Sequence, residues 1–222
     1  MPVRRRFLAL AVACLALPVV ALGADPQSKS SWEGAIARFE QADREQPPAA
    51  GGIVFVGSSS IRLWDLKESF PDLPVLNRGF GGSHLSDSVH FADRIVTKYR
   101  PRLVVLYAGD NDIASGKTPE RVRDDFRAFV DRVHSTLPET KILFLAIKPS
   151  PARAKHAAAQ ATANRLIADE IAKNPRLAFV DVGTPLLDAA GKPRAELFVK
   201  DQLHLSEEGY AVWSELLRPL LQ

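Results

Sequence analysis

Five short apolar segments, separated by longer amphipathic ones, constrain the fold of this 222-residue chain more than any other feature. The short segments are rich in Val, Ile, Leu and Phe, as expected of strands that are buried on both faces. They are residues 53–56, 75–77, 103–107, 142–147 and 178–182. Because strands and helical patterns alternate, the sequence predicts an α/β fold with a parallel sheet and helices on both of its faces.

Helical periodicity occupies the segments between these strands. The predicted helices span residues 84–99, 119–136 and 154–173, and a last helix follows Ser206. We see no repeat and no interdomain linker, so residues 25–222 are predicted to form a single domain.

A further helix is predicted to begin at Ser30, after a short polar tail. Ser30 and Glu33 have the spacing of a capping box, in which each side chain accepts a hydrogen bond from the other residue's backbone. This helix would carry Trp32, Ile36 and Phe39 on its apolar face.

The first 24 residues have the composition of a secretory signal peptide. Three arginines at residues 4–6 precede an apolar run over residues 7–22, and the small residues Gly23 and Ala24 follow. We therefore expect a periplasmic or secreted protein. A retained N-terminal anchor is one alternative, and lipid attachment at Cys14 is another, although Ala11 fits a lipoprotein cleavage site poorly.

Removing this segment changes what the composition implies about partners. Residues 1–24 hold three of the 29 basic residues and none of the 26 acidic ones, so the predicted mature chain is formally neutral. We find no basic stripe that would bind nucleic acid and no later apolar run of the roughly 20 residues needed to span a bilayer. Cys14 is the only cysteine, so the mature chain would hold no disulfide.

Three predicted loops each follow a strand directly and should therefore meet at one edge of the sheet, where ligands bind in folds of this kind. Residues 57–60 contain Ser58, Ser59 and Ser60, which could supply a nucleophile or could merely cap the next helix. Residues 79–82 are glycine-rich, which suits either a tight turn or a backbone that approaches a ligand closely. In the third loop, the Asn111 amide could donate to an oxyanion, or the loop could be a solvated turn.

Asp201 and His204 are the sharpest candidates for chemistry. Residues three apart on one turn face the same way, so the carboxylate could hold the imidazole through Nδ1–H and leave Nε2 to act as a base. A capping aspartate and a surface histidine would have the same spacing. The other histidines show no metal-ligand spacing, and we predict no metal and no cofactor.

Four blocks of this sequence, in order, resemble those of the SGNH hydrolases, also called the GDSL lipase/esterase family. They are Gly57-Ser58-Ser59 with Trp64 beyond it, Asn77-Arg78-Gly79-Phe80-Gly81-Gly82, Gly109-Asp110-Asn111-Asp112, and Asp201-Gln202-Leu203-His204 with Gly209-Tyr210 beyond it. The resemblance covers about 170 residues, and four blocks in register are far more specific than any one alone.

The resemblance implies a three-layer α/β/α fold with a flavodoxin-like, five-stranded parallel sheet. It makes Ser59 the nucleophile, His204 its base and Asp201 the residue that orients the imidazole. Gly82 and Asn111 would bind the oxyanion. The family usually has Asp where Ser58 stands, and the register with Trp64 favours Ser59 over its two neighbours.

The expected activity is the hydrolysis of carboxylic esters of small molecules, with no cofactor. A short-chain or acetyl ester is favoured because no long apolar lid segment is visible; the oligomeric state is not predicted. Two alternatives come from other classes: a flavodoxin-like cofactor-binding protein, and a catalytically silent carbohydrate-binding domain that uses Trp64 and Trp213.

Overall fold

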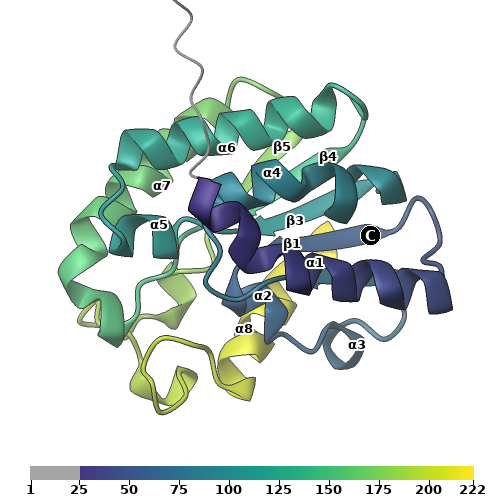
Figure 1. Ribbon diagram of the computed structural model, residues 1–222. Helices are drawn as coiled ribbons and strands as arrows, with labels where there is room; N and C mark the ends of the chain where they lie inside the picture. The colour runs from purple at the N-terminus through teal and green to yellow at the C-terminus, as the bar shows by residue number, and fades with distance from the viewer. Residues whose placement is uncertain (1–25) are drawn as a thin grey trace, which may run out of the picture.

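The computed structural model describes residues 26–222, with side chains from Trp32 onward; the predicted signal peptide, including Cys14, lies outside this range. Five parallel strands form one sheet in the order β2-β1-β3-β4-β5. Their bounds are Ile53–Gly57 (β1), Val75–Gly79 (β2), Leu103–Tyr107 (β3), Lys141–Leu145 (β4) and Leu177–Val180 (β5). Figure 1 shows the sheet with helices on both sides, so the predicted α/β fold with a five-stranded parallel sheet is confirmed.

Eight α-helices cover the sheet in the described part of the chain. They are α1 (Pro26–Glu45), α2 (Ser59–Arg62), α3 (Leu66–Ser69), α4 (Leu85–Ile95), α5 (Asp110–Ala114), α6 (Pro119–His134), α7 (Ala157–Ile171) and α8 (Glu207–Leu217). Short 3-10 helices cover Thr97–Tyr99, Pro151–His156, Thr184–Leu186, Ala195–Leu197 and Arg218–Leu220. No helix among residues 26–222 is long and apolar enough to cross a membrane.

The strands alternate their side chains between two separate cores. Val54 and Val56 of β1 pack into a core with helices α1, α4, α6 and α7, whereas Ile53 and Phe55 of the same strand pack into a second core. The second core lies under α2, α3 and α8 and includes Trp213, which is fully buried. Because every residue of β1 and β3 is buried, polar function is confined to the strand ends.

The predicted strands agree with the observed ones to within two residues at each end, but three helices differ. Helix α1 begins at Pro26, so Ser30 lies inside it and the polar tail is shorter than predicted. Proline suits the first turn of a helix, where its missing N–H is not needed. The helix predicted over residues 84–99 breaks at Val96, which has a non-helical backbone, and residues 151–156 form a 3-10 helix before α7.

Ion pairs to the body of the domain fix the position of α1. Arg78, at the end of β2, is 5% exposed and pairs with Asp43 of α1. The Arg78 Nε–H donates to the Tyr99 hydroxyl at 2.7 Å, and that hydroxyl donates to Asp43 at 2.6 Å. Lys98 also pairs with Asp43 at 2.6 Å. The group is therefore a closed polar network between α1, β2 and the segment after α4.

Two further contacts hold the same helix closer to its N-terminus. Arg94 of α4 donates to Glu40 at 2.7 Å, and the Trp32 indole N–H donates to Asp87 at 3.2 Å. Helix α1 is thus tied to α4 along much of its length, as Figure 1 shows from their adjacent positions.

We expect Arg78→Met to lower the free energy of unfolding by about 3 kcal/mol, because it leaves the largely buried Asp43 carboxylate without its closest cation. Lys98 still pairs with Asp43 in this variant, so the expected loss of stability is at the lower end of the range for breaking a buried ion pair. Urea denaturation measures the change. Arg132→Met is the matched control: Arg132 pairs with Asp93 on an exposed surface, and its loss should amount to about 1 kcal/mol or less. Equal losses in the two variants would contradict the role given to Arg78.

Candidate active site

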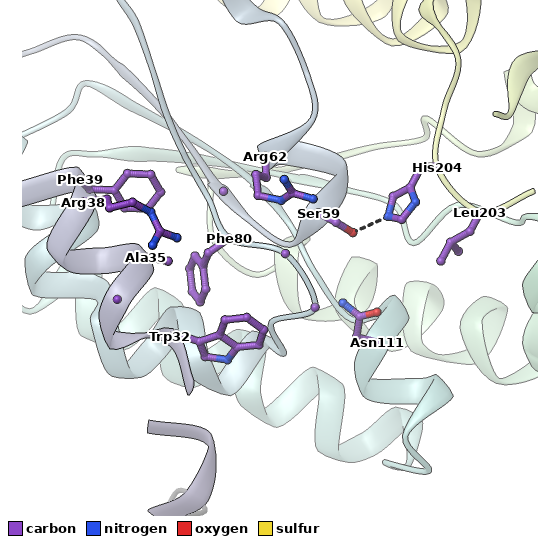
Figure 2. A pocket seen from close by; sticks show the side chains of 14 residues that line it. Trp32, Ala35, Arg38, Phe39, Ser59, Arg62, Phe80, Asn111, Leu203 and His204 are labelled. Carbon is purple, nitrogen blue, oxygen red and sulfur yellow. Dashed lines mark hydrogen bonds between the residues drawn. The ribbon is translucent and has the colours of Figure 1, made fainter. Parts of the chain in front are cut away.

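The three predicted loops meet at the carboxyl edge of the sheet and surround a cavity of about 780 Å³. Its lining includes Ser59, the glycine-rich segment 79–82, Asn111 and His204, together with one face of α1. Figure 2 shows these side chains around a common space. The convergence follows from the parallel topology, since β1, β2 and β3 are neighbours and end at the same edge.

Of the three consecutive serines, only Ser59 lines this cavity. Ser58 and Ser60 are each 3% exposed, and the Ser58 side chain does not cap α2. The turn before them depends on Gly57, whose φ is +134° and at which a Cβ would lie 1.9 Å from the Tyr107 carbonyl oxygen. Glycine therefore lets the chain leave β1 close against β3 and presents Ser59 at the start of α2.

The turn from Asp201 to His204 presents the imidazole to Ser59. The Asp201 Oδ1 atom accepts the backbone N–H groups of Leu203 and His204, each at 2.9 Å. Gln202 between them has a left-handed backbone, with φ of 56°, and its carbonyl accepts the Ala152 N–H at 3.0 Å. The two residues thus share a side-chain-stabilised turn rather than a turn of helix, and their proximity comes from these hydrogen bonds.

An unbroken hydrogen-bonded chain runs from Asp201 through His204 to Ser59. The His204 Nδ1 atom is 2.6 Å from Asp201 Oδ2, and its Nε2 atom is 2.8 Å from Ser59 Oγ. An ionised carboxylate only accepts, so Nδ1 carries the proton and Nε2 accepts from the serine hydroxyl. The Ser59–His204 contact is drawn in Figure 2 and joins residues 145 positions apart in the sequence.

Asp201 is held in its ionised form. Burial opposes ionisation, but hydrogen bonds from the His204 side chain and from the backbone of His204 and Leu203 outweigh it and lower the pKa of Asp201 to about 2. The carboxylate therefore stays charged throughout the neutral and mildly acidic range, where it can orient an imidazole and stabilise its protonated form.

Gly82 and Asn111 line the same cavity as Ser59. Gly82 has φ of +79°, and a Cβ there would lie 3.2 Å from the Trp32 ring. The Asn111 Nδ2 atom donates to the Ser83 carbonyl at 3.1 Å. This bond uses one of the two amide hydrogens and fixes the direction of the other.

Asp110, which precedes Asn111 in the chain, belongs to a buried cluster of polar side chains. Asp110 accepts from Gln160 at 3.0 Å and lies 3.9 Å from the ammonium of Lys148, which is fully buried. Burial lowers the pKa of Lys148, the Asp110 carboxylate opposes this effect, and Arg153 adds to it. Arg153 lies 3.7 Å from Asp110 and does not line the cavity.

The sequence did not identify the α1 side of the cavity. Trp32 and Phe39 were assigned to the apolar face of a helix, yet both line the cavity, as do Arg38 and Arg62. One signal was available for Arg62: it follows Ser59 by three residues, so on a helix the two face the same side. Nothing in the sequence indicated that Lys148 is buried, because a lysine before two prolines is typical of a solvated loop.

The tryptophans required by the carbohydrate-binding alternative are in the core. Trp64 and Trp213 are 3% and 0% exposed, and their rings lie 5.5 Å apart. Neither ring can stack on a sugar at the surface. The alternative prediction, a carbohydrate-binding domain that uses these two tryptophans, is therefore wrong.

A serine, a histidine and an aspartate in hydrogen-bond contact, at the carboxyl edge of a parallel sheet, form the arrangement of a serine hydrolase. A family model for the GDSL-like Lipase/Acylhydrolase family matches residues 62–212, more than half of the chain. The chain belongs to this family, as its sequence blocks suggested, and is an enzyme that acts on ester bonds. Because the chain belongs to this family, we discard the alternative prediction of a flavodoxin-like cofactor-binding protein.

Individual relatives agree with the family assignment. Platelet-activating factor acetylhydrolase IB subunit alpha1 of Bos taurus is 29% identical over 219 residues, covering 89% of this chain and 88% of that protein. A GDSL-like lipase from Bacteroides thetaiotaomicron has a TM-score of 0.71 at 20% identity, covering 84% of this chain and 96% of its own. An acetylxylan esterase from Geobacillus stearothermophilus has a TM-score of 0.61 at 15% identity, covering 77% and 94%. At these identities the two structures show the shared fold.

We expect Asp201→Asn to lower kcat for ester hydrolysis by about 10³- to 10⁴-fold, because a neutral amide neither holds the required tautomer nor stabilises the imidazolium. Steady-state kinetics on a chromogenic ester measures the loss. Asp188→Asn is the matched control, since Asp188 also accepts backbone N–H groups in a turn but does not line the cavity. If both variants kept wild-type kcat, Asp201 would have no part in the chemistry.

Proposed function

We propose that this protein is an exported serine esterase that hydrolyses short-chain carboxylic esters, acetyl esters being the simplest, with Ser59 as nucleophile. The observation that carries the proposal is the contact chain from Ser59 Oγ to His204 Nε2 and from His204 Nδ1 to Asp201 Oδ2, at 2.8 Å and 2.6 Å. Export follows from the signal-peptide pattern of residues 1–24.

The reaction proceeds by acyl transfer in two steps. Ser59 Oγ attacks the ester carbonyl as His204 Nε2 takes its proton, and the imidazolium then protonates the leaving alcohol. Water, deprotonated by the same nitrogen, attacks the acyl-serine and releases the acid. Asp201 remains ionised and stabilises the positive imidazolium in both steps.

Negative charge develops on the carbonyl oxygen and needs donors that are already in place. The second N–H of Asn111 and the backbone N–H groups of Ser59 and Gly82 are the donors we assign. The glycine at position 82 allows its backbone to approach the oxyanion, and the Ser83 carbonyl fixes the Asn111 amide. Preorganised donors of this kind supply a large share of catalysis in serine hydrolases.

The names of two similar proteins support a short acyl group. The bovine relative is an acetylhydrolase and the Geobacillus neighbour an acetylxylan esterase, so both names refer to the acetyl group.

We expect Ser59→Ala to abolish nearly all ester hydrolysis and all labelling by a fluorophosphonate, which reacts only with an activated serine. Ser58→Ala and Ser60→Ala should retain most of the activity, because both residues are buried away from the cavity. These two variants control for the loss of a hydroxyl in the same segment. A folded Ser59→Ala protein with wild-type turnover would refute the proposal.

We expect Asn111→Ala to lower kcat by about 100- to 1,000-fold while KM changes little, since the amide acts on charge that appears only in the transition state. Kinetics on p-nitrophenyl acetate separates the two constants. Thermal unfolding of the variant checks that losing the bond to Ser83 leaves the loop folded. A normal kcat would remove Asn111 from the oxyanion site.

A further inference from the structure

The cavity extends well beyond the space that an ester carbonyl needs at Ser59. Figure 2 shows His204 on one side of Ser59, and Arg62, Phe80, Trp32 and Arg38 on the other. His204 must protonate the leaving alcohol, so the alcohol lies on the His204 side. The acyl part of the ester therefore points across Ser59 toward α1 and Arg62.

The acyl side of the cavity carries positive charge. Arg38 and Arg62 line it, and no Asp or Glu of the described chain does so. Most other arginines within residues 32–222 pair with a carboxylate or a carbonyl oxygen, as Arg78 and Arg94 do. No salt bridge or hydrogen bond from the Arg38 or Arg62 guanidinium to any described residue is present. Both groups are exposed to the cavity with their donors available.

The position of Arg62 is set by α2 and by the glycine-rich loop. Ser59 and Arg62 are three residues apart on the same short helix, so their Cβ atoms are about 5–6 Å apart. A Cβ at Gly81 would lie 2.9 Å from the Arg62 Nε atom. The guanidinium group therefore lies against the Gly81 backbone, next to Gly82, on the wall of the cavity that holds Ser59.

Arg38 lies on helix α1, which several contacts fix to the body of the domain. Helix α1 is fixed through Asp43, Glu40 and Trp32, as described above, and Arg38 projects from it into the same cavity. Trp32 and Phe80 pack edge to face at 5.9 Å and form an apolar surface near the two cations. A guanidinium group binds carboxylate or phosphate through charge-assisted hydrogen bonds, which are stronger than hydrogen bonds between neutral groups.

We propose that this cavity selects esters whose short acyl group ends in an anion, such as a hemisuccinate-type carboxylate, with Arg62 and Arg38 as the binding residues. The inference rests on the proposed esterase function and adds its substrate class. The apolar surface contacts the carbon chain of the acyl group, and the guanidinium groups bind its terminal anion.

The test compares two matched pairs of esters. In the first pair the acyl group differs: mono-p-nitrophenyl succinate, which ends in a carboxylate, against p-nitrophenyl methyl succinate, which is neutral. In the second pair the alcohol differs: 4-acetoxybenzoate against its methyl ester. We expect kcat/KM in the first pair to favour the anionic ester by about 10- to 100-fold, as a hydrogen bond to a charged group allows. The second pair should show no such preference.

Variants identify the residues responsible. Arg62→Gln should reduce the acyl-side preference to near unity and Arg38→Gln should reduce it several-fold, where the preference is the ratio of kcat/KM for the two esters on the same variant. Arg62→Lys keeps the charge and should retain part of the preference. Arg100→Gln is the matched control, because Arg100 lies before β3 at the opposite edge of the sheet. Added salt should weaken the preference in the wild type.

The outcomes separate this inference from the proposed function. No acyl-side preference, a preference on the alcohol side only, or a preference that survives Arg62→Gln and Arg38→Gln would overturn the anion-binding assignment. Hydrolysis of neutral esters that depends on Ser59 would still support the esterase. Loss of all Ser59-dependent hydrolysis, by contrast, would remove the function on which the inference rests.

Discussion

Burial of the central strands on both faces is the constraint on which the rest of this structure depends. Ile53 and Phe55 enter one core and Val54 and Val56 the other, so β1 has no exposed side chain along its length. Burying each such apolar side chain stabilises the folded state by about 1.5–3 kcal/mol. A polar side chain at the same position would lose this stabilisation and would need a buried hydrogen-bond partner. Chemistry is thereby restricted to the residues at which the chain leaves the sheet. Gly57 begins that exit, and Ser59 follows it by two residues.

A group of mostly buried polar side chains connects two parts of the site. Asp110 joins Gln160, Lys148 and Arg153, and the Ala152 N–H bonds to the carbonyl of Gln202. This network links the loop that carries Asn111 to the turn that carries His204. Burying a lysine is unfavourable unless a carboxylate lies near it, and Asp110 fills that role for Lys148. Asn111 and His204 are thus positioned by one shared group of side-chain and backbone contacts.

Local pattern was enough to predict the strands and the loop that carries each chemical group. Apolar runs such as 103–107 are unambiguous, and a parallel sheet brings its carboxyl ends together whatever the loops contain. The break at Val96 and the start of α1 at Pro26 were missed because helix ends depend on tertiary contacts. Arg38 and Arg62 were missed for a related reason: in the sequence they resemble solvated arginines. The docking of α1 brings Arg38 to the cavity, and the contact of α2 with the glycine-rich loop places Arg62 there.

The docking of α1 therefore connects stability with specificity. The pairs that hold it, Arg78 with Asp43 and Arg94 with Glu40, do not line the cavity and take no part in acyl transfer. They nevertheless decide where Trp32 and Arg38 stand relative to the acyl group. A substitution in these pairs would shift the cavity wall while leaving the contacts among Ser59, His204 and Asp201 unchanged. The hydrogen-bonded chain from Ser59 to Asp201 lies at the sheet edge, whereas one wall of the cavity beside it belongs to a helix that packs against the sheet.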